Sequence, residues 1–169
     1  MARVFVTGGA RSGKSSYAER LASLMGPRVL YLATATAGDD EMQERIQRHR
    51  AQRPSEWATI EAPLAPARAL AASTEPYDVV LFEDLTLLLS NLLLADERHA
   101  EGRTVEEIHA VIQRAPDLVI VSNEVGMGLV PEYPIGRLFR DAMGRVNQRA
   151  AELCDEAYFV VAGLPLRLK

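Results

Sequence analysis

The stretch Gly8-Gly9-Ala10-Arg11-Ser12-Gly13-Lys14-Ser15 decides the fold. It has the spacing of a phosphate-binding loop: a glycine, four residues, a second glycine, a lysine and a hydroxyl residue. The glycines let the backbone take turns that a side chain would obstruct, so that successive amide N–H groups converge on one anion. Lys14 adds a mobile positive charge, and Ser15 places a hydroxyl where a phosphate-bound Mg²⁺ needs a ligand. The sequence therefore predicts a nucleoside triphosphate site at this loop.

The residues on either side of the loop agree with this interpretation. An apolar run at residues 4–6 precedes it and is typical of a strand, and a helical pattern begins at Ser16 and ends before Gly26-Pro27. A helix that starts here also directs the positive end of its dipole toward the bound anion. The alternative is a glycine-rich turn that matches by chance, but the strand and the helix both lie where the motif requires them.

Further along the chain, apolar runs alternate with helical patterns. Strands are expected at residues 29–33, 78–82, 118–122 and 157–161, with a short edge strand at 164–168. Helices are expected at residues 65–73, 85–95, 104–114 and 135–153. Continuously apolar strands suit a parallel sheet that is covered on both faces. The predicted fold is a single α/β domain over residues 1–169 of the P-loop (RecA-like) class, with a mostly parallel sheet and helices on both faces.

Composition narrows the class of protein. The 169 residues carry a net charge of −4, so nucleic acid is not an expected partner. Cys154 is the single cysteine, which excludes an internal disulfide, favours a reducing compartment and is interpreted as a core or helix thiol. The apolar stretch at residues 85–95 is too short to cross a bilayer, and no leader segment is expected before the first strand. We therefore expect a soluble, cytoplasmic protein without a membrane span.

Ligands of doubly wound sheets bind beyond the C-terminal ends of the strands, so the residues that follow each strand are candidates for the site. Glu83 and Asp84 follow the strand at 78–82. Glu83 is the first candidate for the acidic residue that holds Mg²⁺, whereas Asp84 is more consistent with an N-cap of the next helix. Residues 122–128 combine polar side chains with two glycines and are either a wall of the substrate site or only a turn.

A second charged segment reads DDEMQERIQRHRAQR over residues 39–53. Asp39 and Asp40 can cap a helix there, and Arg45, His49 and Arg53 are spaced to share one helical face. Two guanidinium groups near an imidazole disfavour its protonated form, which leaves a neutral nitrogen able to act as a base or a nucleophile. Without further context, a solvated charged helix with a surface histidine is the alternative. The other two histidines, His99 and His109, are interpreted as structural.

Taken together, the motifs resemble a known family. The segments are GGARSGKS, YLATA, DDEM, RIQRHRAQRP followed by Trp57, FEDLTLLLSNLL, VSNEVGMGLVP, FRDAMGRVNQ and GLPLRLK. They run nearly end to end, and the chain resembles the bifunctional adenosylcobinamide kinase/adenosylcobinamide-phosphate guanylyltransferase family of cobalamin biosynthesis. Many enzymes share the phosphate loop, whereas RIQRHRAQRP and SNEVGMGLVP are far more specific. The acidic residue after the third predicted strand, often aspartate in the family, is Glu83 here.

The resemblance implies a set of site residues. In the family a histidine takes GMP from GTP as a covalent intermediate, and its position here is His49, with Lys14 as the second catalytic residue. Nucleotide contacts are implied for the phosphate loop and for Ala33, Thr34, Ala35, Arg50, Ala51, Gln52, Arg53, Glu61 and Glu83. Mg²⁺ is implied on Ser15 and Glu83.

The resemblance also implies substrates and an assembly. GTP and ATP are the expected nucleotides, adenosylcobinamide and its phosphate are the expected acceptors, and a homotrimer is the expected assembly. Two other functions remain open. A P-loop small-molecule kinase without nucleotidyl transfer would need the loop and the metal but no nucleophilic histidine. A regulatory nucleotide switch would bind GTP without corrinoid chemistry, but its guanine-recognition and switch signatures are not found.

Overall fold

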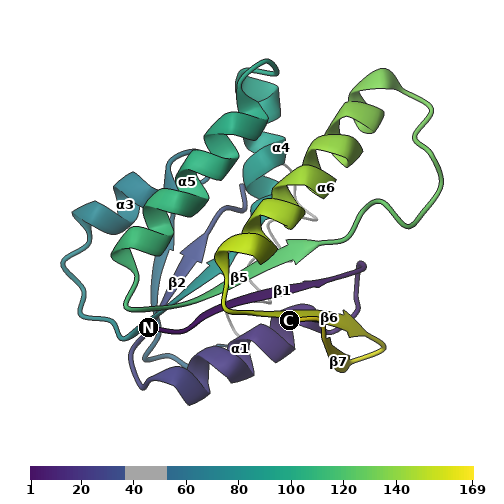
Figure 1. Ribbon diagram of the computed structural model, residues 1–169. Coiled ribbons are helices and arrows are strands. Elements are labelled where there is room, and N and C mark those ends of the chain that lie inside the picture. Colours follow the sequence, from purple (N-terminus) through teal and green to yellow (C-terminus); the bar gives the residue numbers. More distant parts are fainter. Residues whose placement is uncertain (37–52) are drawn as a thin grey trace.

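The computed structural model describes residues 1–36 and 53–169 of the chain. Within these residues one sheet has the strand order β3-β2-β4-β5-β1-β6-β7 (Figure 1). The strands are β1 Arg3–Gly8, β2 Val29–Ala33, β3 Ala58–Glu61, β4 Val79–Glu83, β5 Asp117–Asn123, β6 Glu156–Val161 and β7 Leu164–Arg167. All neighbouring strands pair in parallel except β6 and β7, which are antiparallel. The C-terminal ends of β2, β4, β5 and β1 therefore meet at one edge, which is where the site is expected.

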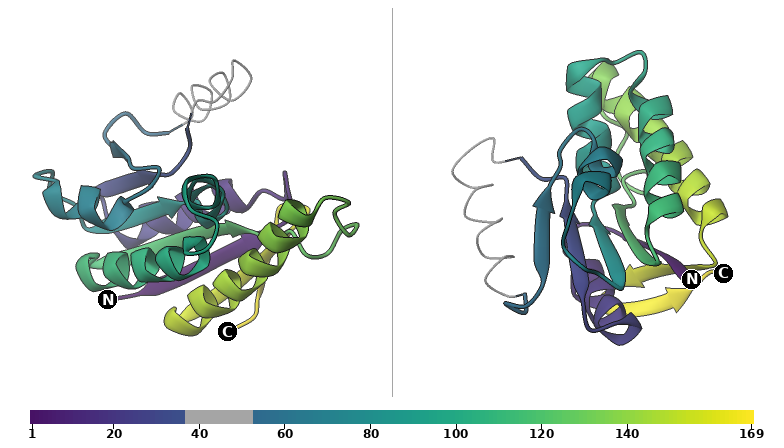
Figure 2. Two further views of the ribbon diagram at one scale, coloured as in Figure 1. Left: turned by 90° about the horizontal axis from the view of Figure 1, so that it is seen from above. Right: turned by 90° about the vertical axis from the view of Figure 1, so that its left-hand side faces the viewer.

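Helices cover both faces of the sheet. They are α1 Lys14–Met25, α3 Pro66–Ala72, α4 Leu85–Ala95, α5 Ala100–Arg114 and α6 Pro134–Leu153. The second view of Figure 2 shows α1 on one side of the strands and α4, α5 and α6 on the other. The prediction of an α/β fold with a mostly parallel sheet and helices on both faces is therefore confirmed.

Among the described residues, two apolar clusters form the core, one on each face of the sheet. In β5, Leu118 and Ile120 pack in the cluster under α4 to α6, whereas Val119 and Val121 pack in the cluster under α1. Alternate residues of one strand thus enter different clusters, and this is why the sequence of the strand is apolar without interruption. The helix α4 is itself core, because Leu85, Leu88, Leu89, Leu92 and Leu93 are all buried.

One strand and two helix starts differ clearly from the sequence-based expectation. The strand β3 was not expected, because its four residues ATIE are only half-buried and carry no apolar run. Helix α5 begins at Ala100 rather than at 104, since the polar first turn hides its amphipathic pattern and Thr104 Oγ1 donates to the carbonyl of Ala100 at 2.8 Å. Helix α1 begins at Lys14, inside the phosphate-loop motif, rather than at Ser16. None of the helices among the described residues is long and apolar enough to cross a membrane.

Candidate active site

The phosphate loop connects the end of β1 to the start of α1, as the motif requires. Two of its glycines are demanded by geometry. A Cβ on Gly8 would lie 2.4 Å from the carbonyl oxygen of Val160, and Gly13 has a φ of 92°, in the left-handed region that favours glycine. The N–H of Ser12 donates to the carbonyl of Gly9 at 3.3 Å, which closes the turn. The loop therefore has one defined shape, with the N-terminus of α1 directed into it.

The turn between β6 and β7 supports the loop from outside. The N–H of Gly163 donates to the carbonyl of Ser12 at 2.8 Å. A Cβ on Gly13 would lie 3.1 Å from the Cα of Gly163, so the two segments are in close backbone contact. The antiparallel edge of the sheet therefore fixes the loop that the N-terminal strand carries.

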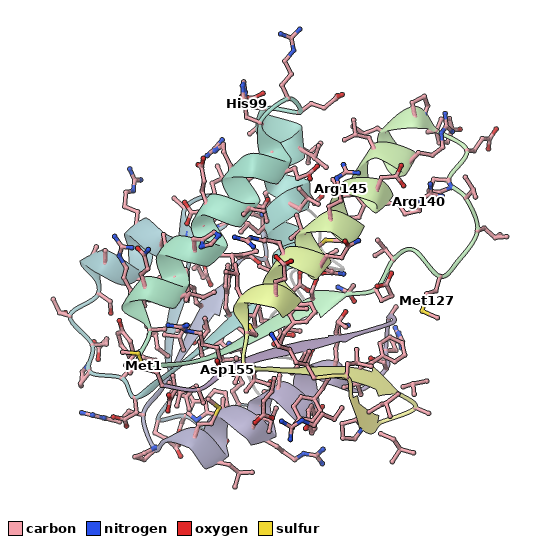
Figure 3. The ribbon with its side chains drawn as sticks, in the orientation of Figure 1. Met1, His99, Met127, Arg140, Arg145 and Asp155 are labelled. Atoms are coloured by element: carbon pink, nitrogen blue, oxygen red, sulfur yellow. The ribbon has the colours of Figure 1, made fainter. Side chains whose placement is uncertain are left out.

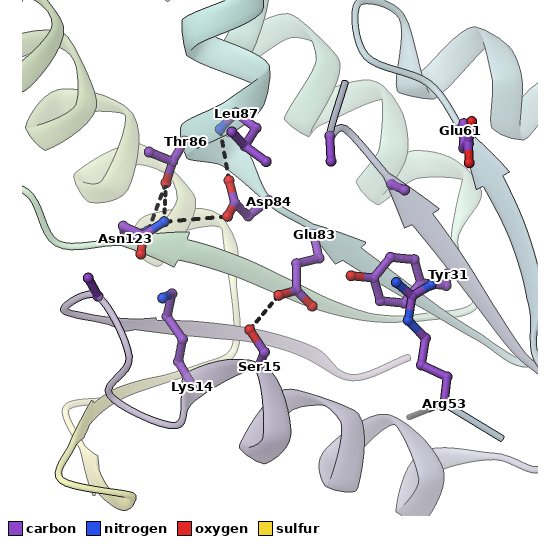
Figure 4. A pocket seen from close by; sticks show the side chains of 13 residues that line it. Lys14, Ser15, Tyr31, Arg53, Glu61, Glu83, Asp84, Thr86, Leu87 and Asn123 are labelled. Atoms are coloured by element: carbon purple, nitrogen blue, oxygen red, sulfur yellow. Dashed lines mark hydrogen bonds between the residues drawn. The ribbon is translucent and has the colours of Figure 1, made fainter. Parts of the chain in front are cut away.

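Ser15 and Glu83 lie side by side across the ends of α1 and β4. The hydroxyl of Ser15 donates to Oε1 of Glu83 at 2.5 Å (Figure 4). The other carboxylate oxygen, Oε2, is buried and has no hydrogen-bond partner among the described residues. Lys14 lies beside them with only 8% of its surface exposed. The two predicted metal residues are thus brought together next to the predicted phosphate-binding lysine.

This pair fits a magnesium ion. Mg²⁺ prefers oxygen ligands and is held in nucleotide sites by one or two protein oxygens together with phosphate oxygens and water. The Ser15 hydroxyl and the unpartnered Glu83 oxygen supply such a set. Over residues 1–36 and 53–169, no group of three or more His, Cys, Asp or Glu side chains is placed to hold a metal. The nucleotide would therefore have to complete the coordination.

A cavity opens above this pair, at the C-terminal ends of β2, β4 and β5. It is lined by Ala10, Lys14, Ser15, Tyr31, Ala33, Ala35, Arg53, Glu61, Glu83, Asp84, Thr86, Leu87 and Asn123. Eight of the residues predicted from sequence are in this set, from the loop, the end of β2, Arg53, the end of β3 and the end of β4. The structure thus gathers them around one cavity.

Other predicted residues are not among those that line the cavity. Thr34 is buried beneath the cavity, where its hydroxyl donates to the carbonyl of Asp84 at 2.7 Å and accepts from the N–H of Asp84 at 2.8 Å, so it joins two strand ends. His49, Arg50, Ala51 and Gln52 lie outside the described residues, as do Asp39, Asp40 and Arg45 of the same predicted helix. The helical-face prediction for that segment therefore stays a prediction.

Arg53 closes one side of the cavity and is paired with an aromatic ring. Its guanidinium carbon lies 3.4 Å from the ring centre of Tyr31, and its Nε and Nη1 are buried without a hydrogen-bond partner among the described residues. Burial first, and then the charge of Glu83, raise the pKa of Tyr31, so the phenol stays neutral. Burial also raises the pKa of Glu19 to about 6, with the charge of Glu83 as the second cause.

Asp84 is the N-cap of α4, as its sequence position indicated. Its Oδ1 accepts a hydrogen bond from the N–H of Leu87 at 2.8 Å. Burial raises the pKa of Asp84 to about 6, and the hydrogen bond from Leu87 opposes that rise. Asp84 also lines the cavity, so it combines a structural position with a place next to the candidate metal pair.

Sequence reasoning missed Tyr31, Thr86 and Leu87, and placed Asn123 only within the segment 122–128. Of that segment, Asn123 lines the cavity, whereas Glu124 accepts from the N–H of Gly126 at 2.8 Å and closes a turn. No sequence pattern indicated that Tyr31 belongs to the site, because it lies inside an apolar run that is typical of a buried strand. Its partner Arg53 comes from a different part of the chain, and no local pattern joins the two.

The cysteine and the two histidines in the described part of the chain lie away from the cavity. Cys154 is buried at the end of α6, and burial raises its pKa to about 12, which confirms the interpretation as a core thiol. His99 precedes α5, with Nδ1 2.8 Å from Oδ2 of Asp96, and Figure 3 places it at the turn between α4 and α5. His109 lies on α5, with Nε2 3.3 Å from a guanidinium nitrogen of Arg149.

The sheet order, the glycine loop and the paired Ser15 and Glu83 define a P-loop nucleotide-binding protein of the α/β class. A solved structure of a KaiC-like protein from the archaeon Pyrococcus horikoshii has the same fold, with a TM-score of 0.51 at 10% sequence identity over 94% of this chain and 71% of that chain. The particular family follows from the sequence comparison. A family model described as cobinamide kinase / cobinamide phosphate guanyltransferase matches residues 4–168, and the chain belongs to this family.

Curated relatives agree with the family. The chain is 45% identical over 168 residues to the bifunctional adenosylcobalamin biosynthesis protein CobP of Pseudomonas aeruginosa, which covers 99% of this chain and 97% of that protein. It is 43% identical over 180 residues to the bifunctional adenosylcobalamin biosynthesis protein CobU of Salmonella typhimurium, covering 98% and 99% of the two chains. The family resemblance that the motifs indicated is confirmed.

Proposed function

We propose that this chain phosphorylates adenosylcobinamide and then transfers GMP from GTP to the resulting phosphate through a guanylylated His49, which gives adenosylcobinamide-GDP. The proposal is carried by the arrangement of Lys14, Ser15 and Glu83 around one cavity in a chain whose family is described by both activities. GTP and ATP are the proposed nucleotides.

In the kinase half, the residues of the loop hold the triphosphate. The N–H groups of the loop and the ammonium of Lys14 would surround its phosphate oxygens and stabilise the negative charge that develops there during transfer. Ser15 and Glu83 would hold Mg²⁺, which when bound neutralises part of the phosphate charge. The hydroxyl of the acceptor attacks the γ-phosphorus, and the nucleoside diphosphate leaves.

In the guanylyltransferase half, His49 attacks the α-phosphorus of GTP and pyrophosphate leaves. The cobinamide phosphate then displaces the histidine. Arg53 supports a second anion-binding position in the cavity, because two of its nitrogens are buried without a partner among the described residues and an anionic oxygen would satisfy them.

The covalent step is tested with labelled GTP. A phosphorus–nitrogen bond to imidazole is labile in acid and comparatively stable in base, so GTP labelled at the α-phosphate should leave an acid-labile, base-stable label on the protein. GTP labelled at the γ-phosphate should leave none at this site. His49→Ala should abolish both the α-label and the transfer of GMP.

Two other histidines provide matched controls. His99→Ala and His109→Ala change imidazoles that lie outside the cavity, so both variants should label as the parent does. Label on His49→Ala, or transfer at the parent rate without label, would contradict the covalent mechanism. Phosphorylation without any label on the parent would instead favour a small-molecule kinase that lacks nucleotidyl transfer.

We also propose the homotrimer and the cytoplasmic location that the family resemblance implies. Large apolar side chains of the segment between β5 and α6 support an assembly, because Met127, Leu129, Val130 and Tyr133 are more than half exposed; Figure 3 shows Met127 on this segment. The buried single cysteine supports a reducing compartment. Light scattering of the purified protein should give three times the mass of one chain.

A further inference from the structure

Asn123 occupies the central position of the sheet edge that carries the site. It is the last residue of β5, the strand between β4 and β1. Its register partner in β1 is Gly8, where the phosphate loop begins, and it lies two residues beyond Val121, the partner of Glu83 in β4. Asn123 therefore lies between the loop and the acidic strand end, and it lines the cavity with Lys14.

The orientation of its amide is set by its neighbours. Nδ2 donates to Oγ1 of Thr86 at 2.9 Å and lies 3.4 Å from Oδ2 of Asp84. An ionised carboxylate only accepts hydrogen bonds, so the NH₂ end of the amide has to face Asp84. The carbonyl oxygen Oδ1 then points to the other side, and Figure 4 shows it on the side of Lys14.

The backbone of Asn123 is also fixed, from behind the cavity. Its N–H donates to Oγ1 of Thr86 at 2.9 Å, and its carbonyl accepts from Nδ2 of Asn147 at 3.0 Å. Asn147 is buried on α6, and its own Oδ1 accepts from the hydroxyl of Ser122 at 2.6 Å. Both ends of the Asn147 amide are thus engaged in holding the end of β5. Because the main chain and Nδ2 of Asn123 are both held, the side-chain oxygen Oδ1 points in one direction.

The remaining group is the side-chain oxygen Oδ1, an acceptor that has no partner in the part of the chain that the structure describes. Within residues 1–36 and 53–169, no hydrogen bond to Oδ1 of Asn123 is formed. A carbonyl oxygen repels phosphate oxygens, which are also acceptors, so its partner in a nucleotide site has to be a donor. The lysine of a phosphate loop reaches the β- and γ-phosphates, so this acceptor lies at the end where phosphoryl transfer takes place.

We propose that Asn123 is a catalytic residue of the kinase step, in which its Oδ1 accepts a hydrogen bond from the acceptor hydroxyl and directs the hydroxyl oxygen at the γ-phosphorus. In that step the hydroxyl oxygen forms a bond to the γ-phosphorus, and the bond from the γ-phosphorus to the bridging oxygen breaks. The electron pair of that bond leaves with the nucleoside diphosphate. The hydroxyl proton passes through a phosphoryl oxygen to solvent, because an amide does not take it. Asn123 thus contributes orientation rather than proton transfer.

The inference rests on the proposed kinase activity and is tested by separating the two half-reactions. Asn123→Ala should lower kcat for phosphorylation of cobinamide by about 10- to 100-fold. Nucleotide affinity, measured by calorimetry, and GMP transfer to ready-made cobinamide phosphate should stay within about threefold, since neither uses the acceptor hydroxyl. Asn123→Asp keeps the shape and an acceptor oxygen, so its kinase kcat should exceed that of the alanine variant.

Asn91 provides a matched control within the same region. Its Nδ2 donates to the carbonyls of Thr34 at 2.9 Å and Pro63 at 3.0 Å, so Asn91→Ala removes a structural amide beneath the end of β2 and should change both half-reactions alike. An equal fall of both half-reactions in Asn123→Ala, a fall in nucleotide affinity that accounts for the loss, or an unchanged kinase kcat would each overturn the assignment. A parent protein that does not phosphorylate cobinamide would contradict the proposed function itself.

Discussion

The guanidinium carbon of Arg53 lies 3.4 Å from the ring centre of Tyr31. The ring belongs to β2 and is buried, whereas Arg53 precedes β3, so the contact joins β2 to the segment that leads into β3 at the edge of the cavity. A planar guanidinium stacked on an aromatic face keeps its N–H groups directed sideways. Two of its nitrogens, Nε and Nη1, have no hydrogen-bond partner among residues 1–36 and 53–169, so Tyr31 holds Arg53 in a position from which it can receive an anion.

The first prediction concerns this contact. Tyr31→Leu removes the aromatic face and should weaken GTP binding about tenfold, because a desolvated cation–π contact is worth about 1–2 kcal/mol. Tyr31→Phe keeps the face and should bind GTP as the parent does. Calorimetric titration of each variant with GTP and Mg²⁺ measures the difference.

A tyrosine outside the cavity serves as the control. Tyr158 on β6 packs edge-on against Tyr17 with ring centres 5.4 Å apart, and it does not line the cavity. Tyr158→Leu should therefore leave GTP affinity unchanged. If Tyr31→Leu and Tyr31→Phe lose affinity equally, the phenol hydroxyl rather than the ring supports the site.

The second prediction concerns Lys14. Its stem is packed, with 8% of the residue exposed, so Lys14→Met is the better test because it keeps the stem and removes the charge. The variant should melt near the parent temperature and lose about 100-fold or more in both half-reactions, since charge on the phosphate oxygens is no longer stabilised. Circular dichroism and separate assays of the two reactions check this. Unchanged turnover would remove the loop from the mechanism.

The third prediction concerns Glu83 and the metal. Glu83→Gln keeps the shape and removes the charge that faces the Ser15 hydroxyl, so nucleotide binding should need about tenfold more Mg²⁺ for the same occupancy. In EDTA the variant should bind nucleotide at least as well as the parent, because a negative charge near the phosphates is gone. Glu124→Gln, in the turn after β5, is the control and should titrate as the parent does. Superimposable curves for Glu83→Gln and the parent would exclude Glu83 as a metal-linked residue.

What could be predicted from sequence was what is encoded locally. The conformation of the loop from Gly8 to Ser15 depends on its own glycines, and Glu83 follows an apolar run that is typical of a buried strand. The short strand β3 could not be predicted, because its stability comes from pairing with β2 rather than from its own apolar residues. Local patterns therefore predicted the glycine loop and the acidic end of β4 but not the full edge of the sheet.

The parts of the site that were missed depend on contacts between distant segments. Tyr31 has the sequence pattern of a core residue. Its contact with Arg53 depends on the pairing of β3 with β2, which brings the segment before β3 next to the ring. The orientation of the Asn123 side-chain amide depends on Asp84, and the main-chain carbonyl of Asn123 is held by Asn147. Both partners belong to other elements. Such roles require the strand order, and the strand order is set by long-range packing that a sequence pattern does not record.

The last prediction concerns the pH dependence of stability at Asp84. Burial raises the pKa of this carboxyl from 3.8 to about 6 in the folded protein, a change that corresponds to about 3 kcal/mol. The folded state therefore holds the proton more tightly than the unfolded state. The destabilising contribution of Asp84 is absent below pH about 4, grows as the pH rises to about 6 and is complete above it.

Asp84→Asn removes this contribution and keeps an N-cap, since asparagine caps helices as well as aspartate. At pH 8 the variant should be more stable to urea than the parent by up to about 3 kcal/mol, and at pH 4 the two should unfold alike. The acids that do not interact with Asp84 titrate alike in both proteins, including Glu19 with its pKa of about 6, so their effects cancel in the difference. Urea unfolding at pH 4, 5, 6 and 8 measures that difference. A stability difference that does not change with pH would mean that the Asp84 carboxylate carries no burial penalty, and that any effect of the substitution comes from the cap.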